Sequence, residues 1–107
     1  MKSKCGRSGR GRLPEAFLLE MAEALGVLGH VERLRILEFL AGAGAMPVHR
    51  IVACLKRPQA VVSHHLVKMR QVGVLSATRC GREVEYRVAN RHAITILDCM
   101  RRKGQEL

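Results

Sequence analysis

The spacing of apolar residues changes at Gly73, and this change restricts what the chain can fold into. Before Gly73, apolar residues recur every three or four positions, which is typical of amphipathic helices. After it, Val84, Tyr86 and Val88 alternate with charged residues, which indicates a half-buried strand. The 107 residues have room for one domain of ordinary size. The sequence therefore predicts one mainly α domain with a small β-hairpin near its end.

The expected order of elements is four helices, a hairpin and a closing helix. Pro14 opens the first helix, since proline is tolerated in a first turn, and Asn90 is a candidate cap for the last helix. Cys80-Gly81 is the candidate hairpin turn. The expected helices cover 14–28, from 30 to the glycines at 42 and 44, 47–55, 58–72 and 90–103, and the strands cover 74–79 and 82–88. Two helices joined by a tight turn and followed by a basic hairpin describe a winged helix-turn-helix, here αααα-ββ-α in the α+β class.

Basic residues are concentrated in two parts of the chain. There are 19 Lys and Arg residues against 9 Asp and Glu, a formal net charge of +10. Residues 1–12 contain no acid, and we expect them to form a disordered basic arm that is either a solvated tail or a DNA contact. Between Glu38 and Glu83 every charged residue is basic: Arg50, Lys56, Arg57, Lys68, Arg70, Arg79 and Arg82. A stretch without acids is what a phosphate-facing surface requires.

The predicted helix 58–72 has one apolar and one polar side. At about 100° per residue, Val62, Leu66 and Met69 form a stripe that faces the core. The rest of the helix carries hydrogen-bonding and basic groups and no acid, including Gln59, Ser63, His64 and Lys68. Glutamine and lysine read adenine and guanine edges in the major groove, and serine and histidine reach phosphates or bases. An ordinary surface helix is the alternative, although such helices usually mix in acids.

The two adjacent histidines of this helix are expected to differ. His64 points away from the core and is a candidate DNA contact. His65 lies near the boundary of the core, so we expect a packing residue with one hydrogen bond and no metal.

The first helix carries apolar residues on two sides. Phe17, Met21, Leu25 and Leu28 form one stripe, and Leu18, Leu19, Ala22 and Val27 add a second. A surface helix needs only one apolar stripe. We therefore expect the other side of this helix to be buried against a partner chain.

Three segments together resemble the ArsR/SmtB family of bacterial winged-helix repressors: LGHVERLRILEFL (28–40), QAVVSHHLVKMRQVGVL (59–75) and TRCGREVEYRV (78–88). The resemblance implies a homodimer joined through helices 14–28 and 90–103. It also implies operator binding by the helix 58–72 and the wing 74–88, and release by a small inducer or a metal. The positions that match the family's DNA-reading residues are Gln59, Ser63, His64 and Lys68, with Arg79, Arg82 and Arg87 in the wing. From the acid-free stretch we add Arg57 as a DNA contact.

The cysteines are the candidate sensor groups. Cys5, Cys54, Cys80 and Cys99 form no Cys-x-x-Cys pair, and the chain has no export signal, so we expect reduced thiols in a cytoplasm. Cys54 is expected in the core. Relatives that bind arsenite or form a regulatory disulfide make Cys5, Cys80 and Cys99 candidate sensor thiols, through which a thiol-reactive species, a metalloid or a metal would act. Cys80, beside arginines at the wing tip, is expected to be exposed, whereas a packing role stays open for Cys99.

Other site types find little support. Residues 46–50 lack the Cys-x-Cys of many metal-sensing relatives, and one chain offers no tetrahedral zinc set, so no metal site or cofactor is specified. No phosphate-binding glycine loop, HExxH or nucleophile elbow is present, which argues against an enzyme. No apolar run is long enough to cross a membrane.

The leading hypothesis is a sequence-specific repressor, whose DNA-binding and dimerisation domain covers 13–103 and whose tail covers 104–107. The alternative is a nonspecific nucleic-acid-binding or protein-interaction module without a sensor.

Overall fold

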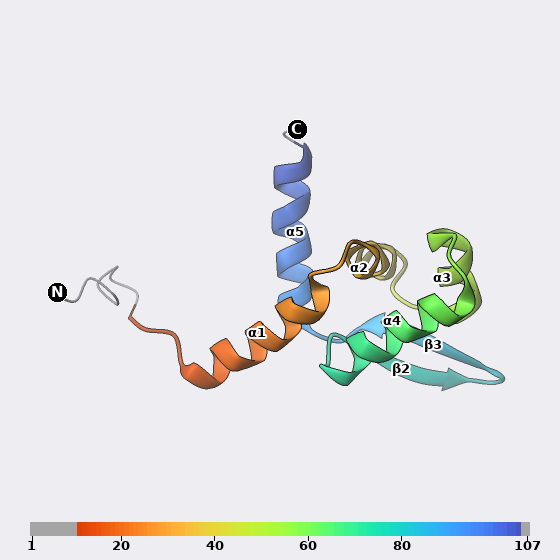
Figure 1. Ribbon diagram of the computed structural model, residues 1–107, viewed down its shortest axis with the longest axis horizontal. Helices are drawn as coiled ribbons and strands as arrows, with labels where there is room; N and C mark the ends of the chain where they lie inside the picture. The colour runs from red at the N-terminus through yellow and green to blue at the C-terminus, as the bar shows by residue number, and fades with distance from the viewer. Residues whose placement is uncertain (1–10, 106–107) are drawn as a thin grey trace.

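A computed structural model describes residues 11–105 of the chain (Figure 1). Five helices and three short strands follow one another in the order α1 (Glu15–Leu28), α2 (Val31–Ala43), β1 (Met46–Pro47), α3 (Val48–Leu55), α4 (Gln59–Gln71), β2 (Leu75–Cys80), β3 (Glu83–Val88) and α5 (Arg91–Gln105). This order confirms the predicted winged helix-turn-helix, with one additional strand. Among the described residues, no helix combines the length and the apolar character needed to cross a membrane.

The sheet is antiparallel, with strand order β1-β3-β2. The sequence did not predict β1, which pairs Met46 with Tyr86 and Pro47 with Glu85. Two residues are too few to show an alternating pattern, so this strand has no signal of its own. Pro47 was expected at the start of the third helix, and it precedes the helix in an extended conformation instead (ψ 160°).

The hairpin turn lies one residue later than predicted. Cys80 belongs to β2 and pairs with Glu83, so Gly81 and Arg82 form the turn. Gly81 has a φ of +65°, which glycine adopts at low cost and cysteine does not. The need for positive φ therefore assigns the first turn position to Gly81. At the other end of the wing, Asn90 caps α5 as predicted, since its Oδ1 accepts a hydrogen bond from the backbone N–H of His92 (2.7 Å).

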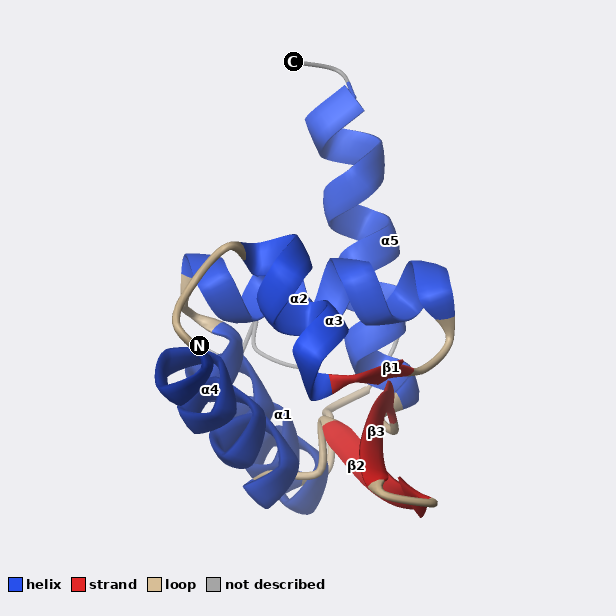
Figure 2. Cartoon of the chain, turned by 90° about the vertical axis from the view of Figure 1, so that its right-hand side faces the viewer, coloured by secondary structure: helices blue, strands red, loops and turns tan. Residues whose placement is uncertain are grey.

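Helix α2 supplies the centre of the core and lies among the other helices and the sheet (Figure 2). Ile36, Leu37 and Leu40 of α2 are completely buried and pack in one cluster with apolar side chains of every other helix and of the sheet. Each such side chain contributes about 1.5–3 kcal/mol to folding. The wing extends away from this core, on the side where α4 lies (Figures 1 and 2).

Helices α1 and α5 reach well beyond the core (Figure 1). In α1 only Ala24 and Leu28 are buried, and in α5 only Ala93 and Leu97. Within the first predicted stripe of α1, Leu28 is buried but Leu25 is 48% exposed. One chain therefore does not cover the whole of that stripe.

Candidate nucleic-acid interface

The backbone conformations of the residues on either side of α4 determine where this helix begins and ends. Lys56 ends α3 in the left-handed region (φ 60°), a conformation that is uncommon for a residue other than glycine. Pro58 then caps α4 with its carbonyl accepting from Val61 and Val62 (3.0 and 3.1 Å). After α4, Gly73 has a φ of +81° and turns the chain into β2. The tight turn between α3 and α4 completes the helix-turn-helix.

The two sides of α4 separate as the sequence predicted. Val62, Leu66 and Met69 are fully buried. On the other side Gln59, His64 and Lys68 are exposed and Ser63 is half-buried. The exposed side carries no carboxylate, so it presents hydrogen-bonding groups and positive charge.

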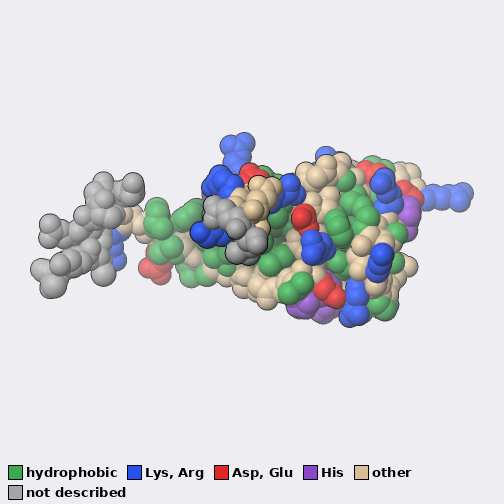
Figure 3. All heavy atoms as spheres, turned by 90° about the horizontal axis from the view of Figure 1, so that it is seen from above, with side chains coloured by type: hydrophobic (Ala, Val, Ile, Leu, Met, Phe, Trp, Pro, Cys, Tyr) green, Lys and Arg blue, Asp and Glu red, His purple; other side chains and the backbone are tan. Residues whose placement is uncertain are grey.

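The wing carries its basic side chains outward. Arg79, Arg82 and Arg87 are all exposed, whereas Leu75 and Tyr86 of the same hairpin are buried. A Lys or Arg side chain projects furthest at the end of the molecule that carries the wing (Figure 3). The wing is therefore suited to phosphates rather than to apolar partners.

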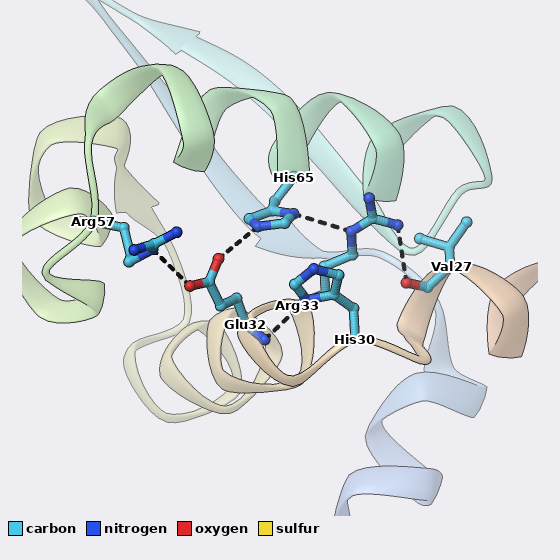
Figure 4. A network of polar contacts seen from close by, with 6 residues as sticks. All are labelled: Val27, His30, Glu32, Arg33, Arg57 and His65. Carbon is cyan, nitrogen blue, oxygen red and sulfur yellow. Dashed lines mark hydrogen bonds and ion pairs between the residues drawn. The ribbon is translucent and has the colours of Figure 1, made fainter.

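A polar network anchors α4 from its buried side (Figure 4). His65 is 5% exposed, and its Nε2 lies 2.8 Å from Oε1 of Glu32. Arg33 donates from Nε to His65 Nδ1 (3.1 Å) and from Nη1 to the carbonyl of Val27 (3.1 Å). Nε of Arg57 lies 2.7 Å from Oε2 of Glu32. The network joins the end of α1, the start of α2 and the α3–α4 turn to α4.

The partners of His65 determine which of its ring nitrogens carries the hydrogen. The guanidinium of Arg33 can only donate, so Nδ1 of His65 must be an acceptor, and Nε2 carries the hydrogen that is donated to Glu32. The sequence predicted one hydrogen bond for His65, and the structure gives it two. The bond from His65, together with the charge of Arg57, holds the pKa of Glu32 below its ordinary value against a smaller opposite effect of burial.

The same network brings three candidate metal ligands together. Ligand atoms of His30, Glu32 and His65 lie within 4.8 Å of one another. A histidine that binds a metal through one ring nitrogen donates the hydrogen on the other to an acceptor. Here the other ring nitrogen faces Arg33, which offers only donors, and Glu32 already faces a second guanidinium. The donor set therefore fits a network of hydrogen bonds and not a metal site.

Arg57 differs from the other predicted DNA contacts. Its side chain is 49% exposed, but its charge is offset by Glu32. The stretch 39–82 contains no acid of its own, as the sequence shows, but Glu32 from outside the stretch lies against Arg57 in the fold. At the edge of the wing, Oε2 of Glu83 lies 3.4 Å from Nδ1 of His49 in α3.

The described cysteines are all exposed thiols: Cys54, Cys80 and Cys99. Exposure of Cys80 confirms the prediction for the wing. The prediction of a core position for Cys54 is wrong. The inner side of α3 is centred between Ile51, Val52 and Leu55, and Cys54 lies about 110° around the helix from that centre. Cys5 lies outside the described residues.

Known proteins resemble this chain in sequence and in fold. A family model described as a helix-turn-helix domain matches residues 28–76. The transcriptional repressor PagR of Bacillus anthracis is 42% identical over 69 residues, which are 64% of this chain and 69% of PagR. Its crystal structure superimposes with a TM-score of 0.77 at 36% identity, covering 81% of this chain and 99% of that one. The chain belongs to the ArsR/SmtB family.

Other relatives extend this ArsR/SmtB assignment. The repressor SmtB of Mycobacterium tuberculosis is 42% identical over 60 residues, 55% of this chain and 44% of SmtB, so the chain spans less than half of that relative. A winged helix-turn-helix fragment of Mb0332 from Mycobacterium bovis, described as homodimeric, shares the fold with a TM-score of 0.74 at 24% identity over 90% of each chain. The family is one of transcriptional repressors and not of enzymes, as the sequence predicted.

Proposed function

We propose that the chain is a homodimeric, sequence-specific transcriptional repressor that inserts α4 into the major groove of its operator. The observation that carries this proposal is the exposed side of α4, which has hydrogen-bonding and basic groups, no acid, and a basic wing beside it. A helix of this diameter fits the major groove, where each base pair presents a distinct pattern of donors and acceptors.

The contacts are divided between bases and phosphates. Gln59, Ser63, His64 and Lys68 read base edges or position α4 against the backbone. The wing arginines Arg79, Arg82 and Arg87 contact phosphates, and Arg57, whose side chain is 49% exposed, does so while it stays paired with Glu32. With about four phosphates neutralised by each protomer, the logarithm of the binding constant falls with the logarithm of salt with a slope of about −7 for a dimer.

Dimerisation through α1 and α5 is supported by apolar side chains that one chain leaves uncovered. Leu18, Leu19 and Leu25 of α1 and Met100 of α5 are all at least 40% exposed. The homodimeric Mb0332 fragment has the same fold. Two-fold symmetry would present two copies of α4 to two half-sites of a palindromic operator.

Release from DNA is assigned to a small inducer that acts on thiols. A thiol-reactive species, a metalloid or a metal bound through cysteines would meet exposed thiols at Cys80 in the wing and Cys99 on α5. Cys5, the third candidate, lies outside the described residues. A modified Cys80 would change the charge and bulk of the wing directly.

Fluorescence anisotropy with the DNA upstream of the protein's own gene tests the proposal, with scrambled DNA as the control. A strong preference for the upstream DNA supports the repressor, and loss of that preference after oxidation or arsenite supports the thiol sensor. A preference that survives both treatments keeps the repressor and removes the sensor. Equal binding to both DNAs would overturn the proposal in favour of a nonspecific or protein-binding module.

Deletion of residues 1–12 separates the two kinds of DNA binding. A repressor that reads bases through α4 keeps its preference for the upstream DNA without the arm. Binding that depends on the basic arm is lost for both DNAs, because the arm supplies charge and no base readout.

A further inference from the structure

Helix α4 exposes a large hydrophobic side chain on the side that is proposed to face DNA. Val67 is 40% exposed, whereas Val62, Leu66 and Met69 of the same helix are fully buried. The other exposed large hydrophobic side chains of the described residues precede α1 or belong to α1, α2 and α5: Leu13, Leu18, Leu19, Leu25, Val31 and Met100. Val67 is therefore separate, by element, from the surface assigned to the dimer.

Val67 lies near the centre of the outward side of α4. At about 100° per residue, Val67 is about 140° around the helix from the buried Val62, with Gln71 at about 180° and His64 at about 200°. His64 and Gln71 are exposed. Ala60, at about 160°, is also exposed and adds only a methyl group. The outward side of α4 thus carries one large apolar side chain, Val67, beside the hydrogen-bonding side chains of His64 and Gln71.

We propose that Val67 contacts the C5-methyl group of a thymine in each half-site and so determines specificity at that base pair. The inference rests on the proposed function, because it requires α4 to lie in the major groove. Thymine is the DNA base that presents a methyl group there, next to its O4 acceptor. A cytosine at the same position carries only a hydrogen on C5 and an amino group in place of O4, so the valine would lose its apolar contact there.

The contact has a definite expected size. Burial of one methyl-sized group is worth about 0.8 kcal/mol, which corresponds to about a four-fold change in affinity for one contact. A dimer that makes the contact in both half-sites therefore loses more than ten-fold when both methyl groups are removed, since the two sites are distant and their effects add.

The experiment starts with selection of duplexes from a random-sequence library by the full-length protein. Each thymine of the recovered duplex is replaced in turn by deoxyuridine, which differs only in the missing methyl group. Binding of wild type, Val67→Ala and Lys68→Ala is measured on every duplex by anisotropy at one salt concentration. The Lys68→Ala variant is the matched control, because it alters the neighbouring exposed residue and leaves the valine in place.

The expected result is a thymine in each half-site whose replacement weakens wild type and Lys68→Ala about four-fold and leaves Val67→Ala unchanged. If the protein recovers a defined duplex but no replacement matters, or if the loss persists in Val67→Ala, the methyl contact is overturned and the repressor stands. If selection recovers no preferred sequence, sequence-specific binding fails, and the methyl contact fails with it.

Discussion

Helix α4 and the wing both present basic side chains, but they are supported in different ways. Helix α4 packs against α1, α2, α3 and β2, and the His65 network holds it from its buried side. The tip of the wing, from Cys80 to Glu83, is exposed on every residue and is held mainly by pairing of β2 with β3. A helix fixed from several directions can place side chains against base edges, whereas an exposed hairpin is suited to charge contacts with phosphates.

This difference predicts where a substitution will change specificity and where it will change only affinity. Base readout requires donors and acceptors at fixed positions, so it depends on the support of α4. A phosphate contact depends mainly on charge and tolerates movement of the side chain. The following changes test the two regions separately, beginning with the support of α4.

The largest expected effect is that of His65→Ala on folding. The substitution leaves a cavity where His65 is 5% exposed, and it removes one hydrogen-bond partner from Arg33 and one from Glu32. We expect a loss of about 2–4 kcal/mol in the free energy of unfolding. Urea unfolding at one fixed protein concentration measures this loss.

His64→Ala is the matched control for His65→Ala. His64 precedes His65 in the same helix and is exposed. Its replacement is therefore expected to alter the free energy of unfolding by less than about 0.5 kcal/mol. Binding of His64→Ala to the selected duplex is nevertheless expected to weaken. Equal stability losses for the two variants would show that the network does not anchor α4.

The next effect in size is that of Lys68→Ala on DNA discrimination. If Lys68 reads a base, the variant loses about 1–3 kcal/mol on the specific duplex and little on scrambled DNA. Anisotropy titrations on both duplexes at one salt concentration measure the two losses. Equal losses would assign Lys68 to a phosphate and make this part of α4 resemble the wing.

The sequence contained enough to predict the order of helices, the hairpin and the polar side of α4, because each of these is encoded by local spacing. It could not predict the pairing of Arg57 with Glu32 or of Arg33 with His65, since these residues meet only when α2 packs against the α3–α4 turn and α4. The two-residue strand β1 was too short to show a period. The helical wheel places Val67 about 140° from Val62, outside the core-facing stripe, and the structure confirms that it is exposed.

A smaller and nonspecific effect is expected for Arg82→Ala at the wing tip. The variant should lose affinity for the specific and the scrambled duplex equally and make the slope against salt less negative by about 0.9 for each lost phosphate contact. Titrations over a range of salt concentrations measure the slope. An unchanged slope would remove Arg82 from the DNA interface, and a selective loss on the specific duplex would mean that the wing also reads sequence.

The smallest expected effect concerns the charge of Glu32. Its pKa in the folded protein lies below the ordinary value of 4.5, because His65 donates to the carboxylate and Arg57 lies beside it. The ionised group therefore stabilises the fold above pH 4.5, and this contribution is lost as the pH falls through the lowered folded pKa. The charge of Glu32 can be removed without its hydrogen bond.

Glu32→Gln keeps an acceptor for His65 without the charge. The difference in unfolding free energy between wild type and Glu32→Gln is thus expected to be constant near neutral pH and to shrink in acid. Other carboxylates titrate in both proteins and cancel. A difference that does not change with pH would mean that the carboxylate acts on α4 only as a hydrogen-bond acceptor, and the charge of Arg57 would then be free for DNA, as it is for the arginines of the wing.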